Sequence, residues 1–232
     1  AVAAYGHALT RGDAVALTSV GAFGNALGGL PIGTALKFSL LMGQFGMTLS
    51  SVFWTYFLFS VVNAVLMMAA GSVLVISNGY SAVLAGVLVL PVLVAIALCL
   101  RLREDTPAWA PQALTVLVTH SGFWATVAVA MANVLAMLGL FGCIVWDEVS
   151  SQSTIDGLIA VTVALPVGFI TGLPSLGGVQ ELLLGTAGTL MALPMQYGIQ
   201  LGLMARGAAL SAAIVGLAVS AHRLLAFRKA GK

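Results

Sequence analysis

The sequence predicts an all-α, polytopic helical membrane protein with two re-entrant helical hairpins in an inverted-repeat arrangement. Composition carries the first part of this prediction, because 60% of the 232 residues are hydrophobic, only 7% are charged and the mean hydropathy is +1.10. A soluble domain carries about 25% charged residues, so this chain cannot cover a water-facing surface. A soluble enzyme, a nucleic-acid-binding protein and a disordered protein are therefore excluded. The apolar runs are continuous, whereas the strands of a membrane barrel alternate polar and apolar residues.

Long stretches without charge mark the membrane-crossing helices, each of which needs about 20 apolar residues. No charged residue lies between Lys37 and Arg101, and the turn sequence at 77–80 divides this stretch. The stretch 112–146 is either a strongly tilted span or an interfacial segment followed by a span that starts near Gly122. We expect one transmembrane domain over residues 1–232, with full spans at about 51–77, 81–102, 112–146 and 194–221.

Two further apolar segments, 14–50 and 156–193, are interrupted near their centres by glycine and proline. The interruptions read GGLPIG and GLPSLGG, and the arms beside them are short for a bilayer crossing. Such short helices can meet inside the membrane as a re-entrant hairpin, where irregular backbone is tolerated if protein or water surrounds it. We therefore expect hairpins at 14–50 and 156–193, with Pro31 and Pro174 at tips inside the bilayer.

The basic residues set the orientation, because Lys and Arg concentrate on the cytoplasmic side of a membrane protein. Arg11, Arg101 and the basic C-terminus all lie on that side if both hairpins return to the face from which they enter. Asp147 and Glu148 then lie outside, and the two hairpins enter from opposite faces. Paired broken helices of this kind are typical of transporter folds, whose binding site lies at the repeat interface. The sequence begins at Ala1 without an initiator Met, so we expect preceding spans to be missing.

Lys37, Glu181 and Arg206 are the only charged residues deep within the predicted membrane segments. An isolated charge at the centre of a bilayer costs at least about 2.5–3.5 kcal/mol, so such residues are few and usually functional. A structural ion pair that locks the hairpins together is the alternative. Lys37 and Glu181 follow their prolines at nearly equal spacing, so we expect them to meet near the midplane and form one polar site with Arg206. The half-helix ends after the prolines carry partial positive charge and suit a lipid phosphate.

The candidate site residues fall into two motifs. The second hairpin and the last span contain a proline, a glycine pair, a glutamate and a distant arginine, at Pro174, Gly177, Gly178, Glu181 and Arg206. The first hairpin contains Asn25, Pro31, Gly33 and Lys37. Both motifs resemble those of the lysylphosphatidylglycerol synthase transmembrane region, a flippase-like integral membrane family. That family usually has arginine at the position of Lys37, which keeps the charge here but loses the bidentate fork.

The resemblance implies that these nine residues bind the substrate of a lipid flippase or transporter, which is not an enzyme. The lipid would be a phospholipid or a polyprenyl-linked lipid. The alternatives are a membrane subunit of an aminoacyl-lipid synthase and a non-catalytic helical subunit of a larger membrane complex. We expect a protein of the bacterial inner membrane with a cytoplasmic C-terminus, which forms a homo-oligomer or joins a larger complex. No motif predicts a catalytic residue, a metal site, a cofactor or a nucleic-acid partner.

Overall fold

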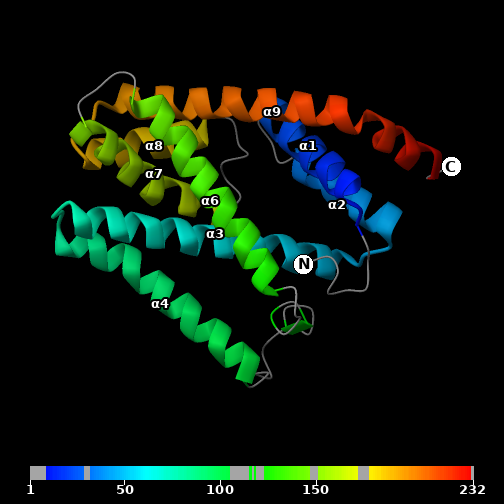
Figure 1. Ribbon diagram of the computed structural model, residues 1–232, viewed down its shortest axis with the longest axis horizontal. Helices are drawn as coiled ribbons and strands as arrows, with labels where there is room; N and C mark the ends of the chain where they lie inside the picture. The colour runs from blue at the N-terminus through cyan, green and yellow to red at the C-terminus, as the bar shows by residue number, and fades with distance from the viewer. Residues whose placement is uncertain are drawn as a thin grey trace.

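The chain folds into α-helices, and its described residues contain no strand (Figure 1). The computed structural model describes residues 9–28, 32–104, 115–116, 118, 123–146, 151–171 and 178–230. The predicted all-α class is confirmed. The helices within these ranges are α1 (Arg11–Gly28), α2 (Ile32–Phe45), α3 (Leu49–Ser77), α4 (Ala82–Glu104), α6 (Phe123–Trp146), α7 (Ser151–Thr171), α8 (Val179–Leu190) and α9 (Met195–Ala230).

Three of these helices are long and apolar enough to cross a membrane. The candidate spans are Leu49–Ser77 in α3, Phe123–Cys143 in α6 and Met195–His222 in α9. Large apolar side chains also cover the outer surface of the bundle, where Val73 is 66% exposed and Val219 is 69% exposed. Extended apolar surface of this kind is unfavourable in water and is typical of a surface that contacts lipid. The chain is therefore a helical protein with candidate transmembrane helices.

Helix α3 runs along the length of the bundle, and local hydrogen bonds set its ends. Thr48 has extended backbone, and its hydroxyl accepts the N–H of Ser51 at 3.2 Å, which caps the first turn. After the helix, Gly79 has a φ of +70°, in the left-handed region that favours glycine. With 29 residues, α3 is roughly 43 Å long, which exceeds the hydrocarbon thickness of a bilayer, about 30 Å.

Helices α4, α6 and α9 lie over three of the predicted spans, with some different ends. Helix α6 begins at Phe123, close to the start near Gly122 that one interpretation of the stretch 112–146 gives. Helix α9 extends to Ala230, beyond the predicted end at 221. Helix α4 contains Pro91 and packs against α3, as does α6.

Helices α1 and α2 form an antiparallel pair, which we call the first helix pair, and glycines make the contact between them. A Cβ atom at Gly24 would lie 2.6 Å from the Cα atom of Gly33, so the two backbones touch here. Asn25 Oδ1 accepts the N–H of Thr34 at 3.1 Å, and Asn25 Nδ2 donates to the hydroxyl of Thr34 at 3.2 Å. Thr34 lies in the first turn of α2, whose N–H groups have no carbonyl partner within the helix. Asn25 therefore caps α2 from the neighbouring helix.

Helices α7 and α8 form the second helix pair, which is also antiparallel. Gly157 near the start of α7 and Gly188 near the end of α8 line the same small cavity. Helix α7 packs closely on α3, because a Cβ atom at Gly71 would lie 2.3 Å from the hydroxyl oxygen of Thr162. Thr162 is fully buried, and its hydroxyl donates to the carbonyl of Ile159 at 2.8 Å. Thr162 therefore packs at the contact between α3 and α7, and its hydroxyl group is hydrogen-bonded within its own helix.

The two helix pairs lie at opposite ends of α3 (Figure 1). Leu17 of α1 and Leu41 of α2 cluster with Val52, near the start of α3. Ile159 of α7 clusters with Val75, near the end of α3. The two pairs are therefore separated along the length of the bundle.

Helix α9 contacts both helix pairs along its length. Figure 1 shows α8 beside the first part of α9, and α1 beside the part nearer the C-terminus. A Cβ atom at Gly198 would lie 2.4 Å from the carbonyl oxygen of Leu184 in α8. A Cβ atom at Gly216 would lie 2.1 Å from Oγ of Ser19 in α1. Close contacts at glycine thus join α9 to each pair.

Candidate functional site

A buried ion pair joins α8 to α9. Arg206 Nη2 donates to Glu181 Oε2 at 3.2 Å and lies 3.1 Å from Oε1 of the same carboxylate. Glu181 is only 4% exposed, whereas the side chain of Arg206 is 27% exposed. The carboxylate is therefore enclosed by protein, while part of the guanidinium reaches the molecular surface.

The glycines of α9 bring the two charged residues together. Gly198, Gly202 and Arg206 are spaced four residues apart, so they lie on one face of α9. A Cβ atom at Gly202 would lie 3.0 Å from Cγ and 3.1 Å from Cα of Glu181, so the glutamate lies directly against this glycine. A larger residue at Gly202 would push the two helices apart and lengthen the ion pair.

One oxygen of the buried carboxylate has no hydrogen bond. Glu181 Oε1 lies 3.1 Å from Arg206 Nη2 in the ion pair, but no hydrogen bond to this atom is found within the described part of the chain. The charge of this oxygen is compensated by the guanidinium, but the atom can still accept a hydrogen bond. This oxygen belongs to Glu181, which the sequence predicts as a site residue.

The start of α8 adds a second source of positive potential beside the carboxylate. Gly178 precedes the helix with a φ of +86°, and no side chain caps the first turn. Glu181 itself lies in this first turn. The partial positive charge of a helix N-terminus stabilises a carboxylate there and equally suits a phosphate.

The structure does not bring Lys37 to Glu181. Lys37 is half-buried on α2, and its stem lies near Gly21 of α1, whose added Cβ atom would be 3.5 Å from the Lys37 Cδ atom. Within the described ranges the only ion pair recorded is the one between Arg206 and Glu181. The expected three-residue polar site is thus reduced to two residues, because the two helix pairs lie at opposite ends of α3.

The other candidate residues have structural positions in the two pairs. Asn25 caps α2, and a Cβ atom at Gly33 would lie 1.9 Å from the carbonyl oxygen of Gly21, so both residues shape the contact between α1 and α2. Gly178 begins α8. Pro31, Pro174 and Gly177 lie outside the described residues, as do the predicted hairpin tips.

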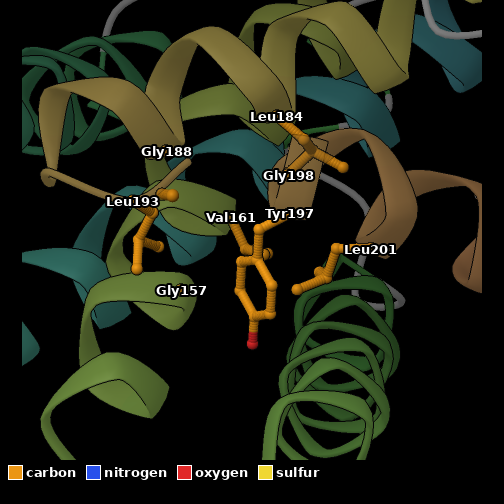
Figure 2. Close-up of a pocket in the computed structure, with 9 residues that line it drawn as sticks. Gly157, Val161, Leu184, Gly188, Leu193, Tyr197, Gly198 and Leu201 are labelled. Carbon is orange, nitrogen blue, oxygen red and sulfur yellow. The ribbon is translucent and has the colours of Figure 1, made fainter. Parts of the chain in front are cut away.

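A small apolar cavity lies between α7, α8 and α9, beyond the ion pair. Figure 2 shows the ring of Tyr197 between the side chains of Leu193 and Leu201, with Gly157 and Val161 beside it. Its free volume of about 10 Å³ is room for about one water molecule. This cavity is too small for a lipid headgroup, so it is not the candidate site.

Two polar contacts between segments of the bundle involve residues that the sequence did not predict as partners. Asn133 Nδ2 in α6 donates to Oδ1 of the buried Asn63 in α3 at 2.8 Å. The hydroxyl of Tyr80, after α3, donates to Asp156 Oδ1 in α7. A single amide within a long apolar run is the signal that could have indicated the first contact, because polar side chains inside membranes bond across helices.

Comparison with family models, with curated proteins and with solved structures finds no match to this chain. The resemblance to the lysylphosphatidylglycerol synthase transmembrane region therefore rests on the two motifs alone. Among the described residues, no group of three or more His, Cys, Asp and Glu side chains is placed to hold a metal ion.

Proposed function

We propose that this chain is a bacterial inner-membrane protein that binds a phospholipid or a polyprenyl-linked lipid and moves it between leaflets. The buried ion pair of Glu181 and Arg206 carries the proposal, because charged side chains inside a membrane are rare and usually functional. Arg206 lies near the middle of the candidate span Met195–His222. Its side chain is 27% exposed, so an anionic headgroup has access to the guanidinium.

The proposal treats the two helix pairs as re-entrant hairpins that enter from opposite faces of the membrane. Helices α2 and α8 have 14 and 12 residues, which is short of the roughly 20 that a crossing needs, whereas their partners α1 and α7 have 18 and 21. The clusters of the two pairs at opposite ends of α3 support an inverted arrangement. In such folds the substrate binds where broken helices end, near the middle of the membrane.

The orientation predicts which residues react with a membrane-impermeant maleimide. We expect a single cysteine at Leu102→Cys to be protected in intact cells and labelled only after permeabilisation, because the basic end of α4 lies in the cytoplasm. A cysteine at Ser151→Cys, at the start of α7, is expected to react in intact cells. Both variants carry Cys99→Ala and Cys143→Ala, so that only the new thiol reacts. Labelling of the cysteine at position 102 in intact cells contradicts the orientation.

A lipid movement assay tests the proposed function. The purified protein is reconstituted into phosphatidylcholine vesicles that contain a trace of fluorescent phosphatidylglycerol, with equal pH on both sides. Dithionite added outside quenches only the outer leaflet, so continued loss of fluorescence measures movement from the inner leaflet. We expect the wild-type protein to move the probe faster than protein-free vesicles do, and Arg206→Gln to abolish the difference.

Arg11→Gln is the matched control, because it removes the same charge at an exposed position at the start of α1. This variant is expected to move lipid as the wild type does. Wild-type vesicles that lose fluorescence no faster than empty ones would refute the movement of a phospholipid. Unchanged lipid movement in the Arg206→Gln variant would separate the function from the ion pair.

A further inference from the structure

We propose that the phosphate of a lipid headgroup displaces the Glu181 carboxylate from Arg206, and that Glu181 takes up one proton as it is displaced. The inference rests on the proposed function and adds to it the chemical group that binds and the ion that is coupled. It is based on the different exposure of the two side chains in the ion pair, because Glu181 is buried whereas Arg206 is partly exposed.

Arg206 has donors to offer an incoming anion. A guanidinium carries five N–H donors, and the recorded hydrogen bond uses Nη2 alone. Planar guanidinium groups bind phosphate in a bidentate manner. A phosphate that approaches the exposed part of Arg206 therefore competes with the carboxylate for the same cation.

The first turn of α8 strengthens this competition. Glu181 occupies the anion position at an N-terminus that no side chain caps. A phosphate that enters beside Arg206 reaches the same partial positive charge, which favours any anion placed there. The Glu181 carboxylate thus occupies a position beside the N-terminus of α8 that a phosphate can also occupy.

The charge balance requires a proton. Before exchange, the site holds one carboxylate and one guanidinium and is neutral. After exchange, the phosphodiester anion pairs with Arg206, and Glu181 would be a buried carboxylate without a cation, which is strongly unfavourable. One proton from water joins Glu181 Oε1, the oxygen that lacks a hydrogen bond, and converts the carboxylate to a neutral carboxyl group. One anion and one proton enter together, so the site stays neutral inside the membrane.

No other described ionisable group competes for this role. Helix α8 packs against α7 and α9. Asp156 of α7 lies toward the start of that helix and accepts a hydrogen bond from Tyr80. On α9, Tyr197 lines the cavity near Gly188, and His222 lies near the other end of the candidate span. Arg206 is the charged group that faces Glu181.

Lipid binding at several pH values tests the exchange. The probe is fluorescent phosphatidylglycerol, whose phosphodiester keeps a single charge over the pH range, bound to the full chain in detergent. A fluorescent diacylglycerol with the same chains serves as the ligand without phosphate. A pH-indicator dye in weak buffer measures the protons taken up on binding.

The wild-type protein is expected to take up one proton per lipid and to bind about tenfold more tightly for each unit by which the pH falls. Glu181→Gln removes the proton site and keeps the shape, so it is expected to bind tightly at every pH without proton uptake. Asp13→Asn is the matched control, since Asp13 is another buried carboxylate in a first turn, and it is expected to behave as the wild type. Diacylglycerol is expected to bind weakly and without pH dependence.

The possible failures are distinct. Phosphatidylglycerol binding that takes up no proton, with the same affinity at every pH, overturns the exchange and leaves the proposed function standing. Absence of phosphatidylglycerol binding at every pH overturns both the exchange and a phospholipid as the substrate. Dimethyl phosphate provides the phosphodiester without acyl chains, and we expect it not to displace the lipid. If it binds as tightly as the lipid does, the ligand is a free anion and the lipid assignment is overturned.

Discussion

Arg206→Met is expected to lower the free energy of unfolding by about 3–5 kcal/mol, because it leaves the buried Glu181 carboxylate without its cation. Glu181→Leu is also expected to lower it, because this change leaves the guanidinium of Arg206 without its anion inside the candidate span. Both can be measured by unfolding in mixed micelles with a rising fraction of SDS, followed by the helical circular dichroism signal.

The double variant that carries Glu181→Leu and Arg206→Met provides the control. Removing both charges leaves no buried ion, and apolar replacement of a buried ion pair is often neutral or stabilising. We therefore expect the double variant to recover most of the stability that Arg206→Met loses, but to move no lipid. An Arg206→Met protein as stable as the wild type would show that the ion pair does not stabilise the fold.

Gly33→Ala is expected to destabilise the first helix pair by about 1–3 kcal/mol or more, because the added methyl group has no space. Its Cβ atom would lie 1.9 Å from the carbonyl oxygen of Gly21 and 2.7 Å from the backbone nitrogen of Asn25. Both atoms belong to the backbone, so α1 and α2 must move apart. The separation would also lengthen the hydrogen bond by which Asn25 caps α2. The same unfolding experiment measures the loss.

Gly43→Ala on the same helix is the matched control. No atom lies within 4 Å of the Cβ position at Gly43, so the methyl group meets no obstacle. Alanine also favours a helix over glycine by about 1 kcal/mol. We expect this variant to be as stable as the wild type or more stable. Equal losses at Gly33 and Gly43 would mean that the contact between α1 and α2 is not the cause.

The sequence indicates which segments form helices because those signals are local. A stretch without charge between Lys37 and Arg101 must contain helices, and the turn at 77–80 divides it where α3 ends. Glycine and proline at 28–33 and 172–178 likewise separate α1 from α2 and α7 from α8. The start of α6 at Phe123 lies close to the start near Gly122 that one of the two interpretations of the stretch 112–146 gives, and the sequence alone did not decide between them.

The partners of the charged residues could not be predicted in the same way. Equal spacing of Lys37 and Glu181 after their prolines indicates their distance along each helix, but not which helices are neighbours. The close contacts at Gly198 and Gly202 place α8 against α9, and Glu181 therefore forms its ion pair with Arg206. The contact between Asn63 and Asn133 also depends on which faces of α3 and α6 meet. Lateral neighbours of this kind arise from tertiary packing.

The contacts of α9 have a mechanical consequence. Helices that interlock through large side chains resist sliding, because the ridges of one helix sit in the grooves of the other. Gly198 and Gly202 present no ridge to α8, and Gly216 presents none to α1. Small shear steps along these smooth surfaces require little repacking of side chains. Because α9 is one continuous helix, a slide against α8 would also displace it against α1, so we expect the two ends of the bundle to move together.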